Sequence, residues 1–166
     1  MPKTLAPSSA DDAFRRLSAL CASSEQAPAD LLRKMQTWNM APEAQAAVME
    51  RLQKGKFFDE ERYALAFVSD KLKYNGWGRI RLRHELRHKG IASSAIAHAL
   101  EAIDETLYRE RLRSILSSKL RSEQGKAQNA YALKGKLLRF ASGRGFEQQL
   151  VMDLVDDLSP DEFSDF

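Results

Sequence analysis

Apolar residues recur at the spacing of an α-helix along most of the chain. The two clearest sets are Tyr63, Phe67 and Val68, and Tyr108, Leu112, Ile115, Leu116 and Leu120. These intervals place the side chains on one face of a helix, whereas the alternation typical of a half-buried strand does not occur. Proline, which breaks helices, is absent from the sequence between positions 43 and 159. The pattern predicts an all-α protein.

Three stretches of the chain share one internal pattern. Residues 32–52, 82–103 and 137–158 align with offsets of 51 and then 55 residues. The alignment superimposes three apolar anchors, each with the residue before it: Asn39 and Met40, Gly90 and Ile91, and Gly145 and Phe146. Gly and Asn tolerate the left-handed backbone conformation that ends a helix. Each copy is therefore predicted to contain a helix, a stop, an apolar anchor and a second helix.

A further helix is predicted before each copy, at about residues 13–22, 60–74 and 107–121. The resulting organisation is a flexible N-terminus (1–12), three tandem three-helix repeats (13–56, 57–106 and 107–158) and an acidic flexible tail (159–166). A single repeat of this size cannot bury its apolar face, so neighbouring repeats have to stack. The expected product is an elongated, curved array. In the middle repeat, Asp59 is predicted to cap the first helix.

The net charge of +3 conceals a strong asymmetry along the chain. Residues 71–146 contain 17 basic and 6 acidic side chains, whereas residues 147–166 contain 7 acidic and no basic ones. A basic region of this size favours a surface that binds a polyanion or an acidic protein groove. Solvated helix faces, which also favour Lys and Arg, are the alternative interpretation.

The candidate binding residues belong to this basic region. The centre of the predicted surface is Arg79, Arg81, Arg83, Arg87 and Lys89, and further candidates on the third repeat are Arg139 and Arg144. Trp77 lies next to the cluster and is expected either to pack between repeats or to stack on a base. Trp38 is expected to belong to the core.

Residues 84–88 read HELRH, which fits the H-E-x-x-H pattern of zinc peptidases. The helical spacing buries Leu82 and Leu86, so His84 and His88 are predicted to face away from the core. A third ligand at the spacing used by such enzymes is missing from the sequence, and four basic residues surround the pair. Their charge raises the cost of binding a dication. We interpret the match as accidental and expect neither a metal nor a catalytic residue.

The sequence predicts no cofactor, because it contains no Gly-Lys-Ser/Thr phosphate-binding loop. The single cysteine, Cys21, excludes a disulfide within the chain and is expected to be a buried core thiol. The first twelve residues lack the apolar segment of a signal peptide, and no apolar run approaches the length of a membrane span. We expect a cytoplasmic protein that does not act at a membrane.

The stretch FFDEERYALAFVSDKLKYNGWGRIRLRHELRHKGIASSAIAHAL (57–100) resembles the RecX family, which modulates the RecA recombinase. The similar segments are DEERYALAFV, Gly76 to Arg81, EL..KGI at 85–91 and AL at 99–100, with KLLRF and RGF in the third repeat. The first repeat departs from the pattern, with TWNM in place of HKGI. Ala141 also stands where a larger apolar residue is expected.

The resemblance implies a monomeric, non-enzymatic regulator built from three helical repeats. Such a regulator binds RecA, chiefly in the groove of the RecA filament on single-stranded DNA. It suppresses filament growth, ATP hydrolysis and strand exchange, and so acts in DNA repair by homologous recombination and in the SOS response. Two other hypotheses remain: a helical module that binds nucleic acid without RecA, and the zinc hydrolase, which metal analysis would test.

Overall fold

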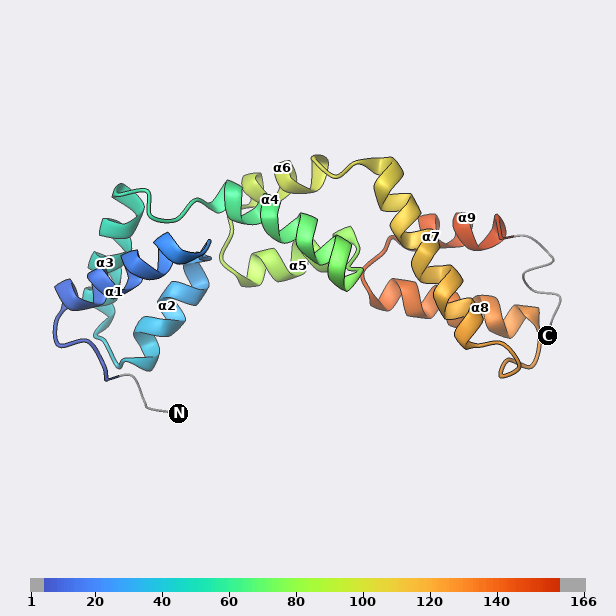
Figure 1. The fold of residues 1–166 in the computed structure, drawn as a ribbon, viewed down its shortest axis with the longest axis horizontal. Coiled ribbons are helices and arrows are strands. Elements are labelled where there is room, and N and C mark those ends of the chain that lie inside the picture. Colours follow the sequence, from blue (N-terminus) through green and yellow to red (C-terminus); the bar gives the residue numbers. More distant parts are fainter. Residues whose placement is uncertain (1–4, 159–166) are drawn as a thin grey trace. The chain divides into compact units, whose positions relative to one another are not determined.

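The computed structural model describes residues 5–158, and these residues form helices and connecting loops without a β-strand. The helices, shown in Figure 1, are α1 (Ala10–Ser23), α2 (Pro28–Thr37), α3 (Pro42–Lys54), α4 (Glu60–Asp70), the π-helical turn η1 (Lys71–Asn75), α5 (Arg79–His88), α6 (Ser93–Glu101), α7 (Glu105–Ser122), α8 (Ala130–Gly143) and α9 (Gln148–Asp156). The predicted all-α class is confirmed. The acidic tail predicted at 159–166 lies outside the described residues.

The chain divides into two compact units, which we describe separately. Of the described residues, the N-terminal unit contains 5–66 together with 86–99, and the C-terminal unit contains 67–85 together with 100–158. In the N-terminal unit, α3 packs against both α1 and α2 (Figure 1). The fully buried centre of this packing is Ala13, Leu17, Leu31, Met35, Val48 and Leu52. Cys21 and Trp38 are half-buried against this core, and burial raises the pKa of the Cys21 thiol.

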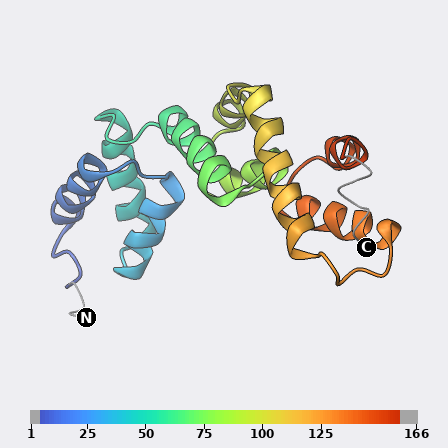
Figure 2. The ribbon, with the colours of Figure 1, turned by 45° about the vertical axis from the view of Figure 1, so that its right-hand side comes forward.

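The core of the C-terminal unit lies among α7, α8 and α9, which pack against one another (Figure 2). Tyr108, Leu112, Leu116, Leu133, Leu137 and Phe146 are all at most 1% exposed. Both long helices begin at a side-chain cap: Asp104 accepts a hydrogen bond from Leu107 N at 2.9 Å, and Asn129 accepts one from Ala132 N at 2.8 Å. Such caps satisfy main-chain donors that have no partner within the helix.

The three predicted helix stops share one backbone geometry. Asn39, Gly90 and Gly145 have positive φ angles of 55°, 77° and 91°. The residue after each stop donates its main-chain N–H to the carbonyl five positions earlier: Met40 to Met35 at 3.2 Å, Ile91 to Leu86 at 3.1 Å and Phe146 to Ala141 at 3.2 Å. This is the Schellman arrangement, in which the left-handed residue ends the helix and brings the next apolar residue over its last turn. The predicted stops and anchors are confirmed.

Other boundaries differ from the prediction for local reasons. Helix α1 begins at Ala10 rather than near residue 13, because the Ser9 hydroxyl accepts a hydrogen bond from Asp12 N at 3.1 Å. The helix expected at 60–74 is α-helical only to Asp70 and continues as η1, which ends at Gly76 with a φ of 62°. Its predicted cap is confirmed, since Asp59 accepts a hydrogen bond from Arg62 N at 2.9 Å.

Candidate binding surface

Helix α5 carries most of the predicted binding residues. Its apolar residues Leu82 and Leu86 are fully buried, whereas Arg83 and Arg87 are exposed. His84 and His88 are exposed as well, as the helical spacing predicts. Of the five basic candidates in this region, only Arg83 and Arg87 are exposed. These two form the outward-facing cationic edge of α5.

Arg79 is held inside the C-terminal unit. Its side chain is 24% exposed and forms ion pairs with Glu105 of α7 and with Glu147, 3.5 Å away, at the start of α9. The guanidinium also lies over the Tyr108 ring, 3.8 Å from the ring centroid. With two carboxylates and an aromatic face as partners, Arg79 fastens the start of α5 to α7 and α9.

The Tyr108 hydroxyl belongs to the same network. It accepts a hydrogen bond from Arg79 N at 3.1 Å and donates one to Glu147 Oε2 at 2.8 Å. Burial, together with the hydrogen bond to Glu147, raises the pKa of this hydroxyl far above its ordinary value. The group therefore stays protonated and keeps its role as a donor.

Removing that hydroxyl is expected to destabilise the C-terminal unit. Tyr108→Phe leaves the Arg79 amide and the Glu147 carboxylate each without one partner in a half-buried site. We expect a loss of about 1–2 kcal/mol in the free energy of unfolding, measured by chemical denaturation. Tyr131, which is 89% exposed, supplies the control: Tyr131→Phe should change stability by no more than about 0.5 kcal/mol. Equal stabilities of the two variants would contradict this role.

Arg81 packs on the half-buried side chain of Trp77. Its guanidinium carbon lies 4.1 Å from the centroid of the indole ring, and Lys71 Nζ lies 5.0 Å from the same centroid. The ring also contacts Phe67, with centroids 6.2 Å apart. Trp77 therefore positions two cations, and its stacking on a base stays an untested prediction.

Lys89 is paired within the N-terminal unit. Its ammonium group lies 2.9 Å from both carboxylate oxygens of Asp30 on α2. The main chain reinforces this contact, because Ala29 N donates to the Lys89 carbonyl at 3.1 Å. Lys89 thus joins the end of α5 to the start of α2.

The two candidates of the third repeat, Arg139 and Arg144, also differ in exposure. Arg139 is exposed on α8. Arg144 is half-buried: its Nη1 donates to the Asn75 carbonyl at 2.7 Å, and its guanidinium lies over the Phe140 ring at 4.9 Å. The sequence analysis missed Arg111 of α7, whose Nε donates to the Leu72 carbonyl at 3.1 Å. Nothing in the local sequence distinguishes Arg111 from its neighbours Arg109 and Arg113.

Within residues 5–158, His, Cys, Asp and Glu side chains nowhere gather in a group of three or more that could hold a metal ion. The same part of the chain has no helix with both the length and the apolar character needed to cross a membrane.

Comparison with known proteins shows which proteins this chain resembles. Residues 59–100 match the family model described as RecX, second three-helix domain. The regulatory protein RecX of Clostridium botulinum (strain Alaska E43 / Type E3) is 29% identical over 123 residues, which are 74% of this chain and 57% of the relative. The chain is thus similar to proteins of the RecX family. It spans little more than half the length of this relative. The RecX of strain Eklund 17B is 32% identical over 104 residues, which are 63% of this chain and 48% of that relative.

Other relatives match over nearly their whole length. The regulatory protein RecX of Mycolicibacterium vanbaalenii is 29% identical over 168 residues, covering 93% of this chain and 90% of the relative. Two crystal structures share the fold. One, a regulatory protein RecX, has a TM-score of 0.80 and 19% identity over 89% of this chain and 71% of that one. The other, RecX from Lactobacillus salivarius, has a TM-score of 0.76 and 12% identity over 90% and 96% of the two chains.

Proposed function

We propose that this RecX-like chain regulates the RecA recombinase by binding, without catalysing a reaction. Its target is the RecA filament on single-stranded DNA, and its effect is to restrain filament growth, ATP hydrolysis and strand exchange. The observation that carries the proposal is the pair of exposed guanidinium groups, Arg83 and Arg87, on the helix that lies within the matched RecX domain. The name shared by the relatives, regulatory protein RecX, supports the same function.

Binding alone is sufficient for such regulation. A protein that binds one state of a filament more tightly than another shifts the equilibrium by the difference in the two affinities. Among the described residues, no carboxylate forms an ion pair with Arg83 or Arg87. Their charge is therefore available to an acidic groove or a phosphate backbone, and attraction at a distance speeds the encounter. Arg79 and Lys89, which already have carboxylate partners, hold α5 in place, and Arg139 on α8 is a further exposed cation.

The test is a titration of RecA ATP hydrolysis on single-stranded DNA at low salt. The wild-type protein should slow hydrolysis, whereas Arg83→Glu/Arg87→Glu should raise the half-inhibitory concentration about tenfold or more, because two attractive contacts become repulsive. The matched control is Lys34→Glu/Lys126→Glu, which changes the net charge equally at two other exposed positions. The control should shift inhibition by less than about threefold.

Two results would contradict the proposal. One is unchanged hydrolysis across the titration of the wild-type protein. The other is equal loss of inhibition in the charge-reversal variant and its control, with both retaining helical circular dichroism. His84→Ala/His88→Ala should inhibit like the wild type, and a complete loss there would favour a metal-dependent activity.

A further inference from the structure

Two guanidinium groups from distant parts of the chain meet at the end of η1. Arg111 reaches from α7 to the Leu72 carbonyl, and Arg144 reaches from the turn before α9 to the Asn75 carbonyl. Between them lies Gly76, which has no side chain. The position that a Cβ of Gly76 would occupy is 2.8 Å from Ile115 Cδ1, 3.3 Å from Arg111 Nη2 and 3.5 Å from Arg144 Nη1. The two groups are therefore close enough to contact one small ligand.

Carboxylates do not neutralise this pair. Three carboxylates of the C-terminal unit form ion pairs with other cations: Glu105 with Arg79 and Arg109, Glu123 with Lys119 and Lys136, and Asp156 with Lys134. Asp70, the acidic residue nearest to η1 in sequence, is exposed. In the part of the chain that the structure describes, neither Arg111 nor Arg144 has an ion-pair partner.

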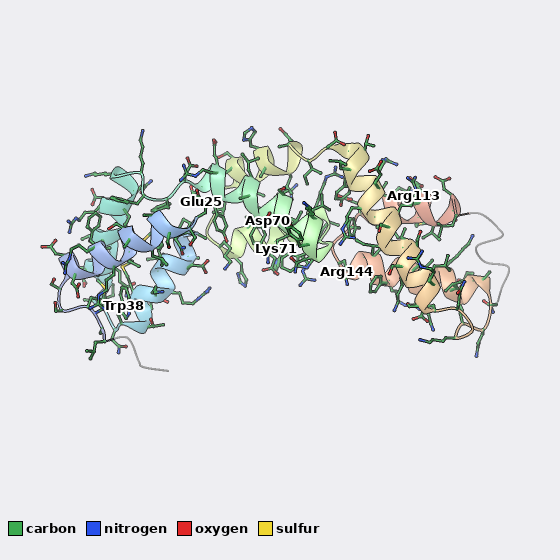
Figure 3. All side chains as sticks on the ribbon, in the orientation of Figure 1. Glu25, Trp38, Asp70, Lys71, Arg113 and Arg144 are labelled. Atoms are coloured by element: carbon green, nitrogen blue, oxygen red, sulfur yellow. The ribbon has the colours of Figure 1, made fainter. Side chains whose placement is uncertain are left out.

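Two further basic residues belong to the segments that this pair contacts. Lys71 and Arg81 both pack on Trp77, and the backbone of Arg81 touches Gly145, the residue after Arg144. Figure 3 shows Lys71 and Arg144 among the side chains of this region. Like charges held close together repel one another, and this repulsion is relieved when an anion binds between them. Arg111 and Arg144 are half-buried, which fixes their position and leaves part of each group open to solvent.

We infer that Arg111 and Arg144 bind a phosphate group, with Arg81 and Lys71 adding to the local potential. A guanidinium carries five N–H donors, and the hydrogen bond to a carbonyl occupies only one in each case. A planar carboxylate is satisfied by one guanidinium fork, whereas a tetrahedral phosphate has enough oxygens to accept from two forks at once. The phosphate belongs to a nucleic-acid backbone or to a free nucleotide. The inference does not depend on RecA.

The test measures binding without RecA, at low salt. The probes are a fluorescein-labelled oligothymidine of about 15 nucleotides, followed by anisotropy, and ATP without a divalent cation, followed by calorimetry. Arg111→Gln and Arg144→Gln should each raise the Kd about tenfold or more. The matched control is Arg113→Gln, an exposed arginine two positions along the same helix (Figure 3), which should change the Kd less than about threefold.

Because Arg111 also caps a carbonyl, a further variant separates binding from folding. Arg111→Lys keeps the charge and can donate to Leu72, but it lacks the fork, so it should melt like the wild type and still bind about fivefold more weakly. Oligonucleotide binding alone would identify a nucleic-acid backbone as the source, and ATP binding of equal strength would identify a free nucleotide. The inference is overturned if neither probe binds, or if Arg111→Lys and Arg144→Gln bind like Arg113→Gln. Such a failure would leave RecA inhibition by the wild-type protein unchanged.

Discussion

Gly145→Ala is expected to destabilise the C-terminal unit by about 3 kcal/mol or more, because it introduces backbone strain and a collision at once. The φ angle of Gly145 is 91°, a conformation that an L-residue rarely adopts. A Cβ at this position would lie 2.5 Å from Arg81 N and would also collide with the Arg81 side chain. Relief of the collision requires α5 to move away from this turn.

That movement breaks the main-chain joint between the start of α5 and the turn before α9. Gly78 N donates to the Arg144 carbonyl at 2.9 Å, and Ile80 N donates to the Gly145 carbonyl at 3.0 Å. Each such bond contributes about 1 kcal/mol, and the left-handed strain adds about 1–2 kcal/mol. The opposing glycine should behave in the same way, since a Cβ on Gly78 would collide with the backbone of Gly145 and Phe146.

Gly143→Ala is the matched control, two positions before the strained glycine. A Cβ at Gly143 would meet nothing within 4 Å, and the residue ends α8 with no positive φ. Alanine there should leave stability unchanged or raise it by up to about 1 kcal/mol, since alanine favours the helix. Thermal unfolding followed by circular dichroism compares the variants. If Gly145→Ala melted at the temperature of Gly143→Ala, the joint would not contribute to stability as described.

Phe146→Ala should cost about 3–5 kcal/mol, the range for removing a large side chain from a packed core. The Phe146 ring is 1% exposed and lies 5.3 Å from the Tyr108 ring, centroid to centroid. The main-chain N–H of Phe146 donates to the Ala141 carbonyl in the Schellman turn, and both residues belong to the core of the C-terminal unit.

The same anchor position in the first copy should be less sensitive. Met40 is only half-buried, so Met40→Ala should cost less than Phe146→Ala. Tyr131→Ala, at a side chain that is 89% exposed, serves as the aromatic control and should stay within about 0.5 kcal/mol. Urea denaturation of the three variants ranks them. A Phe146→Ala loss no larger than that of Tyr131→Ala would show that the anchor does not support the core.

The helices and their ends were predictable because the determining contacts are local. Apolar periodicity reports which face of a helix is buried, and Asn39, Gly90 and Gly145 mark the points where only a left-handed residue fits. Repetition of one stop and one anchor therefore identified the end of the first helix of each copy and the turn after it. Helix α1 began earlier than expected, since any of several polar residues near it is able to act as a cap, and Ser9 does so.

The roles of the individual arginines and lysines were not predictable from their positions in the sequence. Charge is visible in the sequence, but whether it is neutralised depends on which carboxylate the fold brings near. Arg79 meets Glu147 from 68 residues away, and Lys89 meets Asp30 from 59 residues away. The charge asymmetry predicted a basic surface. The fold shows that Arg83 and Arg87 are exposed, whereas Arg79 and Lys89 form ion pairs within the protein.

The sequence by itself determined the all-helical class, the tripled pattern of stops and anchors, and the resemblance to the RecX family, since all three rest on residues close together in the chain. Tertiary structure alone decided that Tyr108 joins Arg79 to Glu147 and that Arg111 and Arg144 meet beside Gly76. The physical reason is that such contacts join segments far apart in sequence. They form only after the apolar faces of the helices have packed and fixed the positions of the polar side chains.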